Sequence, residues 1–433
     1  MTVNAFTPSG VAGASTPAPG DTATLTVQGQ KTPLATVKQT GNLSVNSGLS
    51  GAVSSLNQDS IPVVGQASGG YAPGFTVTET LSSGSTSGMH GLASTPCTAP
   101  DTDFWYLGAE PGPKNTTAKI NLYNGDQLSA QANLVAYTPN GLVSGSAAQL
   151  GQGLVVPPND QRDPIDLSGF STTGDAVAVH VVTTAGRVGA ALLESDGLSG
   201  RDFILAQRPA AHQVLPGVPA LSSRSGSPMK LQLILFSPGA DTDVTLHWIG
   251  GSKITPTVTI PHLSANKVLQ WDISNVPAAG EAGALQIDSS NGTPFLAEIK
   301  VTGVGGDDIA YLSPVQALTG ESLVADNNDG SVVELTNNAA HDAQVQVTVE
   351  GTGTAAPQTV TVPALTTKAV TVPAPRRTAS FVISVTPLGG ADSIYAARVM
   401  TDGNLITIQP MSTALETVQI PPVRDDLSGV VPR

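Results

Sequence analysis

Short apolar runs, many with a period of two, recur along most of the chain and are separated by turn-forming residues. The clearest series lies between Met229 and Thr302, where such runs are broken by Pro, Gly, Asn, Asp and Ser. Alternation of apolar and polar residues is typical of half-buried strands, and the intervening residue types end strands. Because no helical period intervenes, the pattern predicts an all-β protein.

One landmark, an apolar strand that ends in proline, shows that the pattern repeats. It recurs at Pro157, Pro261 and Pro363, at intervals of 104 and 102 residues. The flanking predicted strands follow in the same order each time, which gives seven or eight strands in about 100 residues. That content predicts tandem antiparallel β-sandwich domains of the Ig-like kind, in about three repeats.

A β-propeller is the alternative architecture, since eight strands also make two four-stranded blades. The proline landmark recurs about every 100 residues and has no counterpart at blade-sized intervals of about 40–50. This spacing favours sandwiches. The sequence predicts a flexible spacer at 1–21 and an N-terminal β segment at 22–95, which packs on the next unit without an independent core. Three sandwich repeats follow at 96–220, 221–325 and 326–433, and the third includes a C-terminal tail.

The connections between repeats are short and carry proline, as in Pro209–Pro219 and Pro314–Leu323. Flexible linkers would instead carry Gly/Ser repeats. We therefore expect a semi-rigid rod or arc of repeats.

Charge excludes one class of partner. The formal net charge is −14 and charged residues make up 12% of the chain, without a basic stripe. A protein that binds nucleic acid needs clustered Lys and Arg to neutralise phosphates. Nucleic acid is therefore not an expected partner, and the acidic excess is attributed to solubility.

The ends of the chain bear on its location. Met1–Gly20 lacks the basic and apolar regions of a signal peptide, and no apolar run reaches the length of a membrane helix. The Ser/Thr/Gly/Pro-rich stretch Thr2–Thr22 is typical of a spacer behind a leader or anchor. We expect an extracytoplasmic protein, secreted or on the cell surface, attached to a membrane only through an anchor that this chain does not include.

The run Pro96–Pro100, with Cys97 at its centre, is followed by the aromatic stretch Asp103–Gly108. With the Ser237–Gly239 turn, these motifs resemble an actinobacterial family of secreted or membrane-anchored proteins catalogued only as a domain of unknown function. The resemblance runs from about Cys97 to Val423. It implies a membrane anchor in the full protein and an envelope location. It also implies genes near those of glycosyltransferases, which suggests a part in envelope glycan assembly, and it brings no catalytic residues.

Catalytic patterns are weak in this sequence. The six histidines are His90, His180, His212, His247, His262 and His341. They lie in different units and lack the spacing of a metal site, and no G-x-S-x-G elbow is present. A histidine inside a strand run, such as His180, is more often a satisfied structural residue than a general base. No catalytic residue and no cofactor are expected.

Acidic loop clusters are the candidates for calcium, which binds six to eight oxygen ligands. The residues considered are Asp241, Asp243, Asp326 and Asn328, with further pairs at Asp101 and Asp103 and at Asp307 and Asp308. The stretch around Asp326 lacks the EF-hand glycine and distal glutamate. Asx-turns account for such clusters more often than metal sites do.

Aromatic residues and the single cysteine are the candidates for interaction. They are Cys97, Trp105, Tyr106, Trp248 and Trp271. Exposed rings can stack on sugars, but packing in a core or across strands is the more frequent role. Cys97 has no partner for an internal disulfide, and it is interpreted as a buried small hydrophobe, a reactive thiol or an attachment point.

The sequence therefore favours a non-catalytic structural or protein-interaction protein of the bacterial cell envelope, one that assists envelope glycan assembly. Its expected partner is an envelope protein or glycan. A carbohydrate-binding or adhesive module is the alternative, and an enzyme of unknown class comes third. Function is expected at the junctions between repeats and at Cys97–Gly108, which has no counterpart in the other copies.

Overall fold

The computed structural model describes the chain in a series of segments between Thr2 and Ala414. They are residues 2–7, 18–27, 35–38, 47–52, 63–83, 90–112, 116–197, 200–220, 229–251, 258–260, 262–277, 281–302, 308–326, 331–350, 357–372, 381–389 and 393–414. No helix in these segments has the length and hydropathy needed to cross a membrane.

The first seven strands form two sheets, which we call the N-terminal copy. The strands are β1 (Thr2–Thr7), β2 (Thr22–Val27), β3 (Ala35–Lys38), β4 (Ser47–Ala52), β5 (Val63–Ala67), β6 (Thr76–Ser83) and β7 (Gly91–Pro96), with a 3₁₀ turn η1 (Gly69–Tyr71). One sheet has the order β4-β1-β6-β7 and the other β3-β2-β5.

Copy 1 follows directly. Its elements are β8 (Asp103–Ala109), β9 (Thr116–Asn124), β10 (Ala130–Thr138), β11 (Gly141–Leu142), α1 (Ser146–Gln149), β12 (Leu154–Val156), β13 (Asp160–Gln161), β14 (Ile165–Asp166), η2 (Leu167–Gly169), β15 (Val177–Ala185), β16 (Gly189–Asp196) and β17 (Arg201–Ile204). The sheets have the orders β11-β10-β15-β8 and β13-β9-β16-β17, with β12 on β10 and β14 on β9.

Copies 2 and 3 complete the described chain. Copy 2 contains β18 (His212–Val218), β19 (Lys230–Phe236), β20 (Val244–Ile249), β21 (Val258–Thr259), β22 (Val268–Asp272), β23 (Gly283–Ser289), β24 (Leu296–Thr302) and β25 (Ile309–Leu312). Copy 3 contains β26 (Ser322–Asp326), β27 (Ser331–Asn337), β28 (Ala343–Glu350), β29 (Gln358–Val362), β30 (Thr366–Val372), β31 (Phe381–Leu388), β32 (Ile394–Asp402) and β33 (Leu405–Met411).

The order of strands within each copy distinguishes sandwich from propeller. In copy 2 one sheet is β18-β23-β20-β21 and the other is β22-β19-β24-β25, and copy 3 repeats this as β26-β31-β28-β29 and β30-β27-β32-β33. The chain thus alternates between two sheets, whereas a propeller blade is formed by strands consecutive in sequence. All described strand pairs are antiparallel, and the prediction of an all-β protein with tandem antiparallel sandwiches is confirmed.

Each copy encloses an apolar core between its two sheets because inward residues alternate along both sheets, and buried residues of the next copy extend the cores of copies 1 and 2. In copy 2, Leu233 and Leu235 of one sheet pack against Leu246 and Trp248 of the other. Removing such surfaces from water stabilises a domain by roughly 25 cal/mol per Å² of apolar area. We call the sheet that holds the first strand of a copy its first-strand sheet, and the other its last-strand sheet.

The N-terminal copy is a fourth, incomplete member of the series. Its order β7-β6-β1-β4 matches β33-β32-β27-β30, and β5-β2-β3 matches β31-β28-β29, so only the equivalent of β26 is missing from the described residues. β1 lies within the segment predicted as spacer, and alternate Val3 and Ala5 are buried with Leu25 and Tyr71 in a small core. This finding differs from the predicted set of about three repeats.

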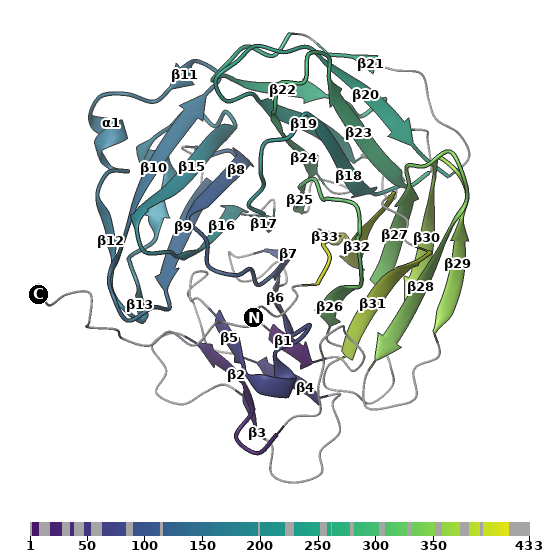
Figure 1. The fold of residues 1–433 in the computed structure, drawn as a ribbon. Helices are drawn as coiled ribbons and strands as arrows, with labels where there is room; N and C mark the ends of the chain where they lie inside the picture. The colour runs from purple at the N-terminus through teal and green to yellow at the C-terminus, as the bar shows by residue number, and fades with distance from the viewer. Residues whose placement is uncertain are drawn as a thin grey trace, which may run out of the picture.

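The copies form a closed ring and not a rod or arc (Figure 1). The last strands β7, β17, β25 and β33 lie at its centre, where each packs on the next, and β33 of the last copy packs on β7 of the first. The expectation of a rod or arc was wrong because the contact of β33 with β7 joins the last copy to the first. Cys97–Gly108 also has counterparts, since β8 occupies the place of β18 and β26.

Candidate functional site

The richest cluster of buried polar groups lies where the four last strands meet, and we call it the central hub. Asp202, Asp308, Glu298 and Thr407 are almost completely buried there. Charged residues are seldom fully buried without partners. The hub is therefore the first place to look for function.

Asp308 is bound by backbone groups from all four copies. Its carboxylate accepts hydrogen bonds from the N–H groups of Leu92 (3.1 Å), Arg201 (3.3 Å), Ile309 (3.0 Å) and Ile406 (2.9 Å). These residues lie on β7, β17, β25 and β33 respectively. One side chain thus joins every member of the ring.

Two glycines make room for this carboxylate. Gly91 and Gly200 have positive φ angles of 133° and 113°. A Cβ atom on either would collide with Asp308 and with the neighbouring backbone. The glycines therefore allow strands from two other copies to approach Asp308 closely.

Burial raises the pKa of Asp308 to about 7, although its four backbone N–H donors favour the charged form and limit the rise. Asp202 forms a second layer, in which it accepts hydrogen bonds from the N–H of Tyr311 (2.8 Å) and the hydroxyl of Thr407 (3.1 Å). Thr407 in turn accepts one from the N–H of Ser94 (3.1 Å). This layer also draws on all four copies, and burial raises the pKa of Asp202 well above its ordinary value.

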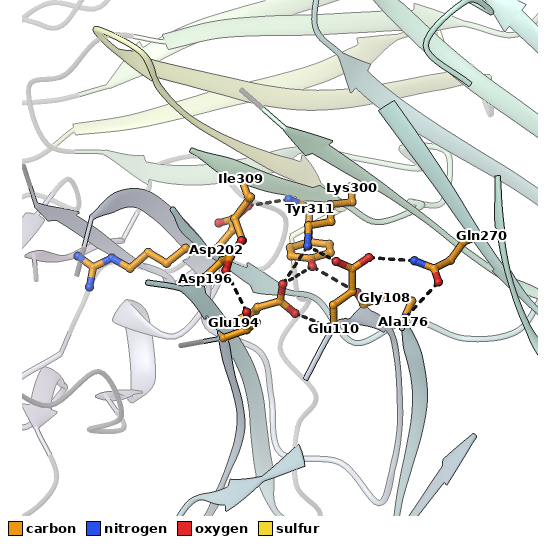
Figure 2. Close-up of polar contacts among 12 residues, drawn as sticks. Gly108, Glu110, Ala176, Glu194, Asp196, Asp202, Gln270, Lys300, Ile309 and Tyr311 are labelled. Atoms are coloured by element: carbon orange, nitrogen blue, oxygen red, sulfur yellow. Dashed lines mark hydrogen bonds and ion pairs between the residues drawn. The ribbon is translucent and has the colours of Figure 1, made fainter. Parts of the chain in front are cut away.

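A charged cluster joins copies 1 and 2 beside the hub (Figure 2). Lys300 Nζ lies 2.6 Å from Glu110 Oε2 and 3.1 Å from Glu194 Oε1. The hydroxyl of Tyr311 donates to the same Glu194 oxygen (2.8 Å). The amide of Gln270 donates to Glu110 (2.9 Å), so groups from both copies enclose the lysine.

Burial alone would lower the pKa of Lys300, but Glu194 and Glu110 raise it above its ordinary value. Burial raises the pKa of Glu110, against the effect of the lysine. Lys300 is therefore held as an ammonium group, whereas a catalytic lysine base needs a lowered pKa. The cluster is arranged to bind two copies together.

Glu298 belongs to the same interface. Its Oε2 accepts hydrogen bonds from Ser313 (2.7 Å) and from the amide of Gln207 (3.1 Å). Burial raises the pKa of Glu298 well above its ordinary value. Each acid of the hub thus has donors from neighbouring strands, and these contacts account for its position.

The tryptophans predicted to mark an interaction face are not brought together. Trp105 lies in the interface of copies 1 and 2, where its ring stacks on His180 with centroids 3.8 Å apart and packs near Phe236. Trp248 is 1% exposed in the core of copy 2, whereas Trp271 is 38% exposed. Of the three, only Trp271 offers a solvent-accessible ring.

The other interaction candidates also separate. Tyr106 is buried in the core of copy 1, and Cys97 is exposed after β7. His180 bonds Asp103 through Nε2 (2.9 Å), which agrees with a satisfied structural histidine.

Two calcium candidates lie beside a histidine. Asp243 Oδ1 is 2.8 Å from Nδ1 of His262, and Asp241 Oδ2 is 3.5 Å from its Nε2. Asp326 ends β26, and Asn328 lies outside the described residues. Among the described residues, no group of three or more His, Cys, Asp or Glu is arranged to hold a metal ion.

Sequence reasoning missed the hub, although two signals pointed to it. Glu298 and Lys300 interrupt an otherwise apolar strand run, β24. Asp202 and Asp308 both lie at the matched segments that close copies 1 and 2. Asp308 was considered for calcium, and the structure instead places N–H donors around it.

Exposed apolar side chains lie along another part of the molecule, the edge of copy 1 formed by β11, β12 and the loop before β10. Leu128 is 82% exposed, and Leu142, Leu150 and Val155 are also exposed. Leu142 and Val155 lie on β11 and β12, which both pair with β10, and Leu150 follows α1 between them. These four residues are called the rim residues of copy 1.

Comparison with known proteins relates the chain to a family. A family model, described as a family of unknown function (DUF5719), matches residues 48–373. The match begins well before Cys97, where the resemblance in the sequence was placed, and it includes part of the N-terminal copy. No curated protein and no solved structure matches the chain.

Proposed function

The chain belongs to the DUF5719 family, for which no function is known, and from its own geometry we propose a non-catalytic protein-interaction platform. In this proposal the ring holds its copies in fixed positions and presents an outer surface to an envelope protein. The partner docks on the outer edge of copy 1.

The uneven distribution of exposed apolar side chains, most of which are rim residues of copy 1, carries this proposal. Among the described residues, six large hydrophobic side chains are exposed, and four of them, Leu128, Leu142, Leu150 and Val155, belong to copy 1. Single exposed apolar residues are ordinary, but several on one edge are typical of a protein contact. Copies 2 and 3 contribute one each, Trp271 and Leu388.

The hub and the charged cluster beside it also support this proposal. The carboxylates of Asp202, Asp308 and Glu194 are bound by groups of neighbouring copies. Acids used in this way fix the relative positions of the copies. A rigid ring loses little conformational entropy on binding, which favours a docking role.

The location and the biological role are part of the proposal. We place the protein outside the cytoplasm, at the cell envelope, where it assists glycan assembly by docking a biosynthetic protein. The resemblance of Cys97–Gly108 and the turn at Ser237–Gly239 to secreted or anchored proteins supports this placement.

Cross-linking in native envelope tests the proposal. The chain would be incubated with envelope membranes and cross-linked, and the linked peptides of the captured protein identified by mass spectrometry. We expect links around β11 and β12, and loss of capture in the double variant Leu142→Asp/Leu150→Asp. The matched control is Leu388→Asp, an exposed leucine on copy 3, which should leave capture unchanged.

A carbohydrate-binding module is the second candidate, and the exposed ring of Trp271 favours it. If purified cell-wall glycan retained the chain and Trp271→Ala abolished retention, glycan binding would replace protein docking as the proposed function. Equal capture of the rim variant and the native chain would also overturn protein docking at copy 1.

A further inference from the structure

Asparagine is followed by glycine at three places in the chain, at Asn124, Asn140 and Asn291. Such a pair can react with itself, because the backbone nitrogen of the glycine can attack the side-chain carbonyl carbon of the asparagine, and glycine has no side chain to hinder the approach. The reaction requires the two atoms to come within about 3–3.5 Å of each other in a suitable orientation. The reactivity of each pair therefore depends on how freely the asparagine side chain can turn.

Asn124 is held in the interior of copy 1. Its side chain is fully buried. The amide nitrogen donates to the carbonyls of Leu128 (2.7 Å) and Val156 (3.2 Å), and the amide oxygen accepts a hydrogen bond from the N–H of Asp126 (2.9 Å). These bonds tie the turn between β9 and β10 to β12, so the side chain of Asn124 is fixed in a structural role.

Asn291 is exposed, but its side chain is fixed as well. Its amide oxygen accepts hydrogen bonds from the hydroxyls of Thr242 (2.8 Å) and Ser289 (3.0 Å) and from the N–H of Thr293 (3.1 Å). Its amide nitrogen donates to the carbonyl of Asp241 (3.1 Å). A turn of this side chain toward the next residue breaks these bonds, and each of them lowers the population of the reactive conformation by roughly two- to tenfold.

Asn140 differs from both. It is exposed in the turn that joins β10 to β11. The backbone N–H of Asn140 donates to Oγ1 of Thr138 (3.2 Å), and this hydroxyl donates to the carbonyl of Gly141 (3.3 Å). The side-chain amide of Asn140 bonds to none of the described residues. The backbone of the turn is thus fixed, whereas the side chain is free to rotate toward the next nitrogen.

The surroundings of Gly141 are open. Its φ angle is 106°, which favours glycine at this position. A Cβ atom added to it would meet only the carbonyl oxygen of Asn266 among the described residues, at 3.9 Å. Both members of the Asn140–Gly141 pair therefore have room to move.

We propose that Asn140 is a site of spontaneous deamidation, on the edge of copy 1 that carries the rim residues. The nitrogen of Gly141 forms a bond to Cγ of Asn140, and the bond from Cγ to the side-chain nitrogen breaks. That nitrogen leaves as ammonia together with the proton of the Gly141 N–H, and a cyclic imide remains. Water is the co-reactant of the second step, in which it opens the imide. Opening at Cγ leaves aspartate, and opening at the backbone carbonyl leaves isoaspartate.

Either product changes the edge of copy 1. Both place a carboxylate two residues before Leu142, and isoaspartate also leads the backbone through the side chain, which lengthens the turn by one carbon atom. Leu142 pairs with Tyr137 in a short strand, and the length of a hairpin turn sets such a register. Deamidation thus displaces a rim residue and ends docking at copy 1. This consequence rests on the proposed function, whereas the reaction itself does not.

Peptide mapping of the full chain tests the reaction. The purified protein would be incubated in mildly alkaline buffer and digested, and conversion at each Asn–Gly pair followed by mass spectrometry with fragmentation that separates isoaspartate from aspartate. We expect Asn140 to convert at least about tenfold faster than Asn291, which several hydrogen bonds hold in place. Asn124 and Asn291 are controls with the same dipeptide in the same molecule. In concentrated urea the three rates should become similar, because only the fold distinguishes the pairs.

Capture of an envelope protein by cross-linking tests the consequence. Fresh chain, aged chain and aged Asn140→Gln would be compared. The longer side chain of glutamine would have to form a larger ring, so Asn140→Gln should keep both its amide and its capture. Capture by the aged native chain should fall in proportion to the converted fraction. Asn291→Gln is the matched control and should lose capture on ageing as the native chain does.

The outcomes separate the reaction from its consequence. Equal or slower conversion of Asn140 relative to Asn291 in the folded chain would overturn the site. Conversion of Asn140 without any fall in capture would overturn its effect on docking. If fresh chain captures no envelope protein, the proposed function fails and the effect on docking fails with it, while the mass spectra still decide whether Asn140 reacts.

Discussion

The two junctions on either side of copy 2 both bury acidic residues, but only the junction with copy 1 pairs them with a cation. At the junction with copy 1, Glu110 and Glu194 enclose the ammonium group of Lys300. At the junction with copy 3, Glu334 of β27 is buried where β27 packs on β18 and β23. Its Oε2 has no hydrogen-bond partner, and burial raises its pKa to about 8.

The difference shows that equivalent interfaces between copies can bury either a paired, charged carboxylate or an unpaired carboxylate. A buried ion pair holds its charge only while each partner is present, because desolvation is offset by the pairing. An isolated carboxylate in an apolar interface takes up a proton instead. The first junction should therefore fail when a partner is removed, and the second should respond to pH.

Removal of the lysine should have the largest effect. Lys300→Met would leave two carboxylates buried beside each other, and we expect it to lower the free energy of unfolding by about 3–5 kcal/mol. Urea unfolding followed by tryptophan fluorescence measures the change. Lys230→Met, at an exposed lysine of β19, is the control and should change it by less than about 0.5 kcal/mol. A loss below about 1 kcal/mol at Lys300 would contradict the account of this junction.

Replacement of the lone acid should act in the other direction. Copy 2 has Ile234 at the place equivalent to Glu334, so Glu334→Ile should stabilise the protein by about 1–3 kcal/mol near pH 8. The sign follows from the pKa, which is about 8 in the folded chain against 4.5 for the free side chain. Between these values the folded state holds a proton that the unfolded state has released.

The contribution of Glu334 to the free energy of unfolding is therefore most favourable below about pH 4.5. It falls by about 1.4 kcal/mol per pH unit as the pH rises toward 8. Glu334→Ile should therefore stabilise the protein near pH 8 and destabilise it near pH 5, where the native side chain is neutral in both the folded and the unfolded state for part of the population. Parallel urea titrations at several pH values measure it. An advantage independent of pH would show that the acid does not titrate as described.

Replacement of Gln270, at the edge of the charged junction, should have the smallest effect on the free energy of unfolding. Gln270→Ala removes the amide that donates to Glu110 but leaves Lys300 in place. We expect a loss of about 0.5–1.5 kcal/mol, the usual range for one hydrogen bond. Gln131→Ala, at an exposed strand position, is the control. A loss as large as that of Lys300→Met would mean that the amide, and not the ammonium group, holds the junction.

Local patterns predicted the sandwiches but not their assembly. The runs that end at Pro157, Pro261 and Pro363 carry a period of two, which depends on neighbouring residues alone. The N-terminal copy was underestimated because the inward residues of its strands are few and small, such as Val3 and Ala5. Only the order of its strands in the sheets shows that the N-terminal copy belongs to the same series of sandwiches.

The interior charges were missed for a related reason. A polar residue in an alternating strand is normally assigned to solvent, yet Lys300 and Glu334 face another copy. The same applies to Trp105, which is covered by Phe236 of copy 2. Burial between copies depends on contacts between residues far apart in sequence, such as Lys300 and Glu110, which are 190 residues apart, and no local period records it.

The carboxylate of Asp308 also orders the assembly of the molecule in time. Its donors are as far away in sequence as Leu92, 216 residues earlier, and Ile406, 98 residues later. Contacts of such separation form late, since the intervening chain must first be confined. Each sandwich can gain its core as it emerges during synthesis, but the ring stays open until the last strand arrives. A chain interrupted before β33 therefore leaves the central acid without the N–H donor of Ile406.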